Sequence, residues 1–208
     1  MRYNKVTNNP AEREFISYPY TWWDGVFSEE ELAKLTTYCD SLELDKGKVG
    51  TLTETGSVEL KTRNSDICFF NRTLDNHWIF DRFNAIVENL NDQFYGFDLQ
   101  GYDSIQYGTY DSVASQHYTW HMDSHHGPSE NIMMMRKFSL AFLLNEPGVD
   151  FEGGEFEINQ GNQNEPMVAD TKKNRVVAFP SWTIHRVKPV TKGIRKSLVL
   201  WVVGPKFK

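Results

Sequence analysis

Apolar and polar positions divide the chain into a helical first part and a strand-rich second part. Ser28-Glu29-Glu30-Glu31 has the form of a capping box and predicts the start of a helix. The apolar stripe of this helix would hold Leu32, Leu35, Cys39 and Leu42. A second helix is predicted over about 74–94, with a buried face made of Ile79, Phe83, Ile86, Val87, Leu90 and Phe94. Both helices are amphipathic, so each is expected to lie against a larger element.

From Phe97 onward the period of the pattern changes to two, which is typical of strands. The strand candidates are 99–107, 117–123, 137–145, 155–159, 175–179, 183–188 and 194–203. Helices followed by a run of strands indicate a mainly β (α+β) fold, a double-stranded β-helix or jelly roll with N-terminal helices packed on one sheet. No repeat or linker divides the sequence, so 1–208 is interpreted as one domain. Its helical support would span about 22–95 and its jelly-roll core about 97–204.

Composition adds limits but no specific function. The chain of 208 residues is 39% hydrophobic and 24% charged, which is ordinary for a globular protein. A net charge of −6 argues against nucleic acid as the main partner, because phosphate contacts need a basic surface. Cys39 and Cys68 lack metal-ligand spacing and favour reduced thiols. The beginning shows neither a signal peptide nor a transmembrane segment, so we expect a soluble cytoplasmic protein with no membrane partner.

Two short segments carry the candidate chemistry. His121-Met122-Asp123 is followed about sixty residues later by a lone His185, a spacing that suggests two imidazoles and a carboxylate on one Fe(II). His121 and Asp123 are two positions apart, so they share one face of a strand. Each half alone is weak, since a polar strand or a structural histidine would also explain it, and His125-His126 suggests a zinc-binding loop instead. The joint occurrence with Arg195 favours iron.

Arg195 lies on an apolar strand at a position that faces inward. It shares its face with Ser197, Val199 and Trp201, whereas Leu198, Leu200 and Val202 face the other way. Burying a guanidinium is costly unless an anion pairs with it, and its planar fork suits a carboxylate better than lysine would. His185 and Arg195 are expected to be neighbours across a hairpin that turns at 190–193. A dicarboxylate ligand anchored by Arg195 accounts for this arrangement.

Four stretches occur in the order and spacing of a known family: 23–28, 107–123, 139–155 and 179–201. The last two are the most specific, with Leu144-Asn145, Gly153-Gly154-Glu155, Phe179-Pro180 and Gly193-Ile194-Arg195. Over roughly 22–205 the chain resembles the 2-oxoglutarate- and Fe(II)-dependent dioxygenase superfamily. Within that superfamily it is most similar to the prolyl 4-hydroxylase-like group, in its bacterial and phage-type members.

The resemblance implies roles for individual residues. His121, Asp123 and His185 would be the catalytic metal ligands, and Arg195 would bind the far carboxylate of 2-oxoglutarate. The rest of the cosubstrate pocket would be formed by Tyr107, Ser197, Trp201, Ser139 and Leu143. Some relatives carry Tyr where this chain has Leu143, which makes Tyr107 the expected phenol donor. Asp123 argues against a halogenase, and Trp201 stands where nucleic-acid demethylases carry a second arginine.

The implied reaction is hydroxylation of an unactivated C–H bond, with 2-oxoglutarate and O₂ converted to succinate and CO₂. The substrate would be a prolyl or other amino-acyl residue. The alternatives are a free small molecule, or a metal-binding jelly-roll domain without oxygenase activity, although the latter would not need Arg195. Aromatic-rich loops around Tyr110 and Trp120 are candidates for a groove that packs on a proline ring, and Tyr118 beside them is a candidate for a substrate lid. Substrate identity, oligomeric state and any ascorbate requirement are left open.

Overall fold

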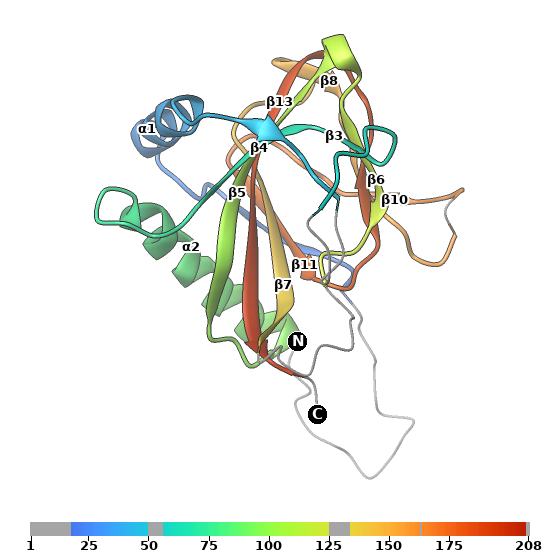
Figure 1. Ribbon diagram of the computed structural model, residues 1–208. Helices are drawn as coiled ribbons and strands as arrows, with labels where there is room; N and C mark the ends of the chain where they lie inside the picture. Colours follow the sequence, from blue (N-terminus) through green and yellow to red (C-terminus); the bar gives the residue numbers. More distant parts are fainter. Residues whose placement is uncertain (1–17, 50–55, 125–133, 163, 207–208) are drawn as a thin grey trace.

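The computed structural model describes residues 18–49, 56–124, 134–162 and 164–206, which form two antiparallel sheets and two main helices (Figure 1). The larger sheet has the order β1-β11-β7-β13-β5-β4-β2, with β8 paired to β13, and the smaller one β10-β9-β12-β6-β3. The larger sheet consists of β1 (Thr21–Asp24), β2 (Asp45–Lys46), β4 (Asp66–Phe70), β5 (Gly101–Asp111), β7 (Met134–Leu143), β8 (Phe151–Gly153), β11 (Arg175–Pro180) and β13 (Val190–Pro205). The smaller sheet consists of β3 (Arg63–Asn64), β6 (His117–His121), β9 (Phe156–Ile158), β10 (Met167–Val168) and β12 (His185–Val187).

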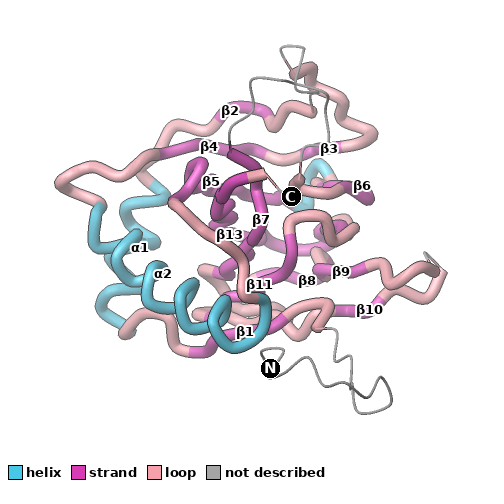
Figure 2. The backbone as a smooth tube through the Cα atoms, turned by 90° about the horizontal axis from the view of Figure 1, so that it is seen from below, coloured by secondary structure: helices cyan, strands magenta, loops and turns pink. Residues whose placement is uncertain are grey.

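The two main helices lie on the flank of the larger sheet that faces away from the smaller one (Figures 1 and 2). Helix α1 (Glu29–Asp40) begins at the predicted capping box: Ser28 Oγ accepts from the Glu31 N–H, and the Glu31 carboxylate accepts from the Ser28 N–H. Helix α2 (His77–Leu90) continues as a π-helical turn through Asn91–Tyr95. The predicted jelly roll with helices packed on one sheet is therefore confirmed.

Apolar side chains form two separate cores, one on each side of the larger sheet. The helix-side core includes Leu198, Leu200 and Val202 together with the buried faces of α1 and α2. The inner core lies between the sheets and includes Leu143, Phe156, Phe179 and Val187. Because successive residues of β13 point to opposite faces, Arg195 and Ser197 face inward, as the alternation predicted. The inner core surrounds the candidate site.

One expected connection is wrong. Segments 183–188 and 194–203 were expected to form a hairpin, but β12 pairs with β6 and β9 of the smaller sheet, whereas β13 pairs with β5 and β7 of the larger one. The chain crosses from one sheet to the other between them, so His185 and Arg195 are not cross-strand neighbours. None of the helices within the described ranges is long and apolar enough to cross a membrane.

Candidate metal centre

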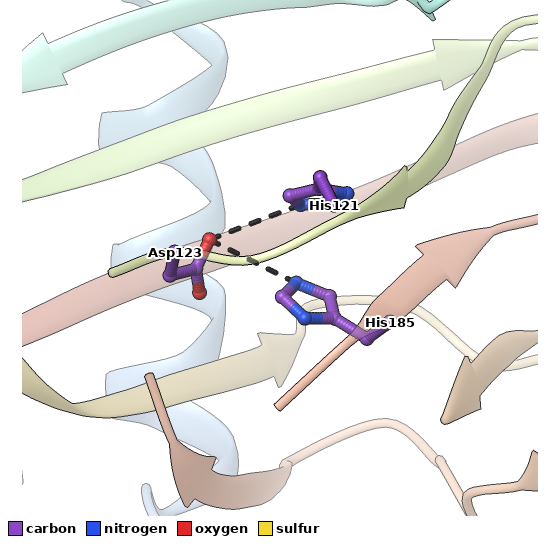
Figure 3. Close-up of side chains that lie close together, drawn as sticks. All are labelled: His121, Asp123 and His185. Atoms are coloured by element: carbon purple, nitrogen blue, oxygen red, sulfur yellow. Dashed lines mark ion pairs between the residues drawn. The ribbon is translucent and has the colours of Figure 1, made fainter. Parts of the chain in front are cut away.

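The three predicted metal ligands come together on the smaller sheet. His121 ends β6, His185 begins β12, and the two are directly paired in register. Asp123 follows in the turn after β6. Its Oδ1 lies 3.8 Å from Nε2 of each histidine, and the side chains point toward one another (Figure 3). The candidate ligand atoms all lie within 4.8 Å of one another.

Backbone carbonyls orient both imidazoles in the same way. Nδ1 of His121 is 2.8 Å from the Thr119 carbonyl, and Nδ1 of His185 is 2.8 Å from the Thr183 carbonyl. If each Nδ1 carries the proton and donates it to the carbonyl, each Nε2 keeps a free lone pair directed toward Asp123. That tautomer is the one in which both histidines bind a metal through Nε2.

The electrostatics of the cluster favour neutral imidazole and ionised carboxylate. Burial, reinforced by His185, lowers the pKa of His121 to about 3. Burial alone would raise the pKa of Asp123, but His185 and His121 outweigh it, so the net direction is downward. Asp123 Oδ2 is buried without a hydrogen-bond partner in the described part of the chain. A buried carboxylate oxygen without a donor is costly, and a divalent cation would satisfy it, so these residues fit an Fe(II) site.

Arg195 is the second buried feature that lacks a partner of opposite charge. It is 3% exposed and forms no ion pair with the residues that the structure describes. Its Nη1 donates to Ser197 Oγ at 2.9 Å, while Nε finds no hydrogen-bond partner within the described residues. Burial lowers the pKa of this guanidinium. An anionic ligand would complete the arrangement, with the Ser197 hydroxyl left free to donate.

The Gly153-Gly154 pair makes room for the anchor. Gly154 has φ +66°, and a Cβ at this position would lie 2.9 Å from Arg195 Cδ and 3.0 Å from Val190 Cγ2. A Cβ on Gly153, whose φ is +75°, would lie 2.5 Å from the Pro189 carbonyl oxygen. Only glycine combines this left-handed backbone with such close approach. The motif therefore shapes the space around the Arg195 side chain.

The expected role of Tyr107 is wrong. Its phenol points to the helix side of β5 and donates to Asp40 Oδ1 at 2.7 Å, and Lys196 binds the same carboxylate. Tyr107 is paired with Leu198, which also faces the helices. The phenol on the anchor's side is Tyr110, which is paired with Arg195 and has its ring centroid 5.5 Å from the guanidinium carbon.

The remaining predicted pocket residues lie on the inner face but divide between the two ends of the site. Leu143 is paired with Ser197, on the anchor's side. Ser139 is paired with Trp201, and its hydroxyl is 2.8 Å from Ser181 Oγ. An interaction with the Ser139 side chain also helps to lower the pKa of the Asp123 carboxyl, so Ser139 lies on the metal's side of the site. Trp201 is buried under Arg136, whose guanidinium carbon is 3.9 Å from its ring.

The aromatic residues of β6 lie on different faces. The Tyr118 ring stacks on His121, whereas Trp120 lies under Arg186 at 4.3 Å on the outer face of the smaller sheet. Trp120 therefore faces away from the triad, and its expected part in a substrate groove stays a prediction. Glu157 is 5% exposed and forms an ion pair with Arg186. The predicted zinc alternative at 125–126 lies outside the described residues.

Comparisons with known proteins agree with the fold and the site. The sequence pattern of the 2OG-Fe(II) oxygenase superfamily matches residues 105–203, the stretch that carries the triad and Arg195. This match covers slightly less than half of the chain, and over it the chain is similar to that superfamily. A "PKHD-type hydroxylase" of Synechococcus sp. (strain JA-2-3B'a(2-13)) is 33% identical over 91 residues, 43% of this chain and 38% of the relative. One from Gloeothece citriformis is 45% identical over 64 residues, 31% of this chain and 28% of the relative. The matches thus span less than two fifths of these relatives' length.

Solved structures agree on the fold over most of the chain. A Pseudomonas putida prolyl-4-hydroxylase has a TM-score of 0.68 at 16% identity, covering 90% of this chain and 94% of its own. A viral collagen prolyl hydroxylase from Paramecium Bursaria Chlorella virus-1 has a TM-score of 0.63 at 18% identity, covering 90% and 97%. At such identities the likeness establishes the jelly-roll architecture and says nothing further of activity.

Proposed function

We propose that the chain is a Fe(II)- and 2-oxoglutarate-dependent dioxygenase that hydroxylates an unactivated C–H bond. One observation carries the proposal. Among the residues that the structure describes, a ligand triad with an unsatisfied carboxylate oxygen and a buried arginine without a counter-charge both border the same inner core. A metal would satisfy the first and a carboxylate the second. 2-Oxoglutarate has a carboxylate at each end, so one molecule would serve both sites.

The chain's own residues would hold and orient the reactants. His121, His185 and Asp123 would bind the metal, and Arg195 with Ser197 would hold the far carboxylate of the cosubstrate. When bound, Fe(II) and 2-oxoglutarate supply the oxidising chemistry, in which O₂ is consumed and succinate and CO₂ are released. The apolar inner core around these groups would exclude water, which strengthens the charge interaction at Arg195.

We propose a prolyl or other amino-acyl residue as the substrate. The similar proteins support this class, because the relative and both solved structures are described as hydroxylases. A free small molecule is the second candidate, because Trp120 packs under Arg186 on the outer face of the smaller sheet and does not line the inner core. Neither candidate needs nucleic acid or a membrane. Cys39 and Cys68 are both free thiols, which favours a reducing compartment such as the cytoplasm.

The test is succinate formation from 2-oxoglutarate by the Fe(II)-loaded protein, with and without ascorbate. Proline-rich peptides and free amino acids would be offered in parallel, and products analysed by mass spectrometry under ¹⁸O₂. Wild type should form succinate, and the substrate should gain one labelled oxygen. His185→Ala should be inactive, whereas Arg82→Met, which alters an exposed arginine on α2, should match wild type. Wild type that binds metal but never consumes 2-oxoglutarate would instead support a binding domain without oxygenase activity.

A further inference from the structure

A stack of side chains covers one of the candidate metal ligands. The rings of Tyr118 and His121 lie 3.5 Å apart between centroids and 11° from parallel. The guanidinium carbon of Arg63 lies 4.7 Å from the centroid of the Tyr118 ring. Because the imidazole covers one face of the phenol ring, the guanidinium must lie over the other. Arg63 and Tyr118 are direct cross-strand partners on β3 and β6.

Arg63 is held firmly behind this stack. It is 7% exposed, and its Nε donates to Ser65 Oγ at 3.0 Å while its Nη2 donates to Gln106 Oε1 at 2.8 Å. Gly47 closes over it, since a Cβ there would lie 2.7 Å from Arg63 Nε. Gln106 belongs to β5 of the larger sheet, so the guanidinium is fixed to both sheets. A charge buried among neutral acceptors is costly, and its stack on Tyr118 is a compensating contact.

His121 needs support of this kind. Its Nδ1 contact with the Thr119 carbonyl fixes one point of the ring but leaves the ring plane free to tilt. A flat partner at stacking distance removes that freedom, because tilting would drive the imidazole into the phenol. The direction of the Nε2 lone pair, which depends on the ring plane, would be set before any metal arrives.

We infer that Tyr118, backed by Arg63, is a positioning residue that fixes the plane of His121 for metal binding. The inference rests on the proposed function, because it treats His121 as a metal ligand. It assigns Tyr118 a task different from contact with substrate. Neighbours that orient metal-binding side chains typically change metal affinity by about 10- to 100-fold when they are removed. Ordinary core packing would change stability and leave metal affinity alone.

The experiment is an anaerobic titration of the apo protein with Co(II), whose visible spectrum reports the geometry of its ligands. Tyr118→Phe keeps the ring and should bind Co(II) as wild type does. Tyr118→Leu removes it and should bind about tenfold more weakly, with altered visible bands. Tyr38→Leu is the matched control: its ring packs on Phe70 in the helix-side core, so it should lose stability without losing affinity. Thermal unfolding of each apo protein gives the stability scale.

The outcomes separate this inference from the proposed function. Wild type that fails to bind Co(II) would overturn both. If wild type binds, and Tyr118→Leu binds with the same affinity and spectrum, only the stack's role is overturned. If the Leu variant does not fold, Tyr118→Met retains the side-chain bulk without a ring face and is read in the same way. Weak binding by Tyr118→Phe would also contradict the inference, because the stack survives in that variant.

Discussion

Gly154→Ala tests whether the Gly-Gly motif shapes the cosubstrate anchor. The added Cβ would lie 2.9 Å from Arg195 Cδ, whereas carbon atoms in ordinary contact are at least about 3.5 Å apart, so the arginine must retreat by about 0.6 Å. The left-handed backbone adds about 1–2 kcal/mol of strain for any residue with a side chain. Val190 Cγ2 would lie 3.0 Å from the added Cβ, so the new methyl group cannot move away in that direction. A displacement of this size would loosen the grip on a carboxylate.

We expect two separate effects in this variant. The free energy of unfolding should fall by about 1–3 kcal/mol, measured by chemical denaturation. The affinity for 2-oxoglutarate, measured by calorimetry on the Co(II)-loaded protein, should fall about tenfold, which corresponds to about 1.4 kcal/mol. Gly96→Ala is the matched control, because Gly96 has φ +68° and a Cβ added there would meet no atom within 4 Å. It should lose similar stability but no affinity. Equal 2-oxoglutarate affinity in Gly154→Ala and wild type would refute the reasoning.

Three further predictions concern contacts away from the anchor. Tyr107→Phe removes the hydrogen bond to Asp40 and should lower the free energy of unfolding by about 1–2 kcal/mol, while 2-oxoglutarate affinity stays unchanged. A loss of affinity would mean that Tyr107 contacts the cosubstrate after all. Arg175 lowers the pKa of Asp24 from 3.8 to about 2, so stability should fall as pH drops from about 4 to 2. Asp24→Asn should not show this part of the loss of stability at low pH, and thermal unfolding measured as a function of pH tests this. Trp120→Ala should keep its Co(II) affinity in titration, and a clear decrease would contradict its outer-face position.

The parts of the site that could be predicted depend on alternation within one strand. His121 and Asp123 were placed together because they are two positions apart, and Arg195 was placed inward because its apolar neighbours leave only that face. Both inferences need one strand and no partner. The helix start at Ser28 could also be predicted from nearby residues alone, since its two hydrogen bonds join residues three positions apart.

The errors arise where two segments had to be related to each other. Tyr107 and Tyr110 are three positions apart and therefore face opposite ways, and only the pairing of β5 with β13 shows which one meets Arg195. The expected hairpin failed because a turn sequence does not reveal whether the next strand joins the same sheet. Short strands such as β3 and β10, of two residues each, are too brief for a period to be visible.

Because the triad lies on one sheet and the anchor on the other, the concentration of 2-oxoglutarate would affect the stability of the folded state. On the proposed function, 2-oxoglutarate would tie the smaller sheet, through the metal, to β13 of the larger one. A ligand that binds only the folded state stabilises it by about 2.7 kcal/mol at a hundred times its dissociation constant. Opening the sandwich would first require the ligand to leave. The cellular level of 2-oxoglutarate would then govern resistance to unfolding and proteolysis as well as turnover.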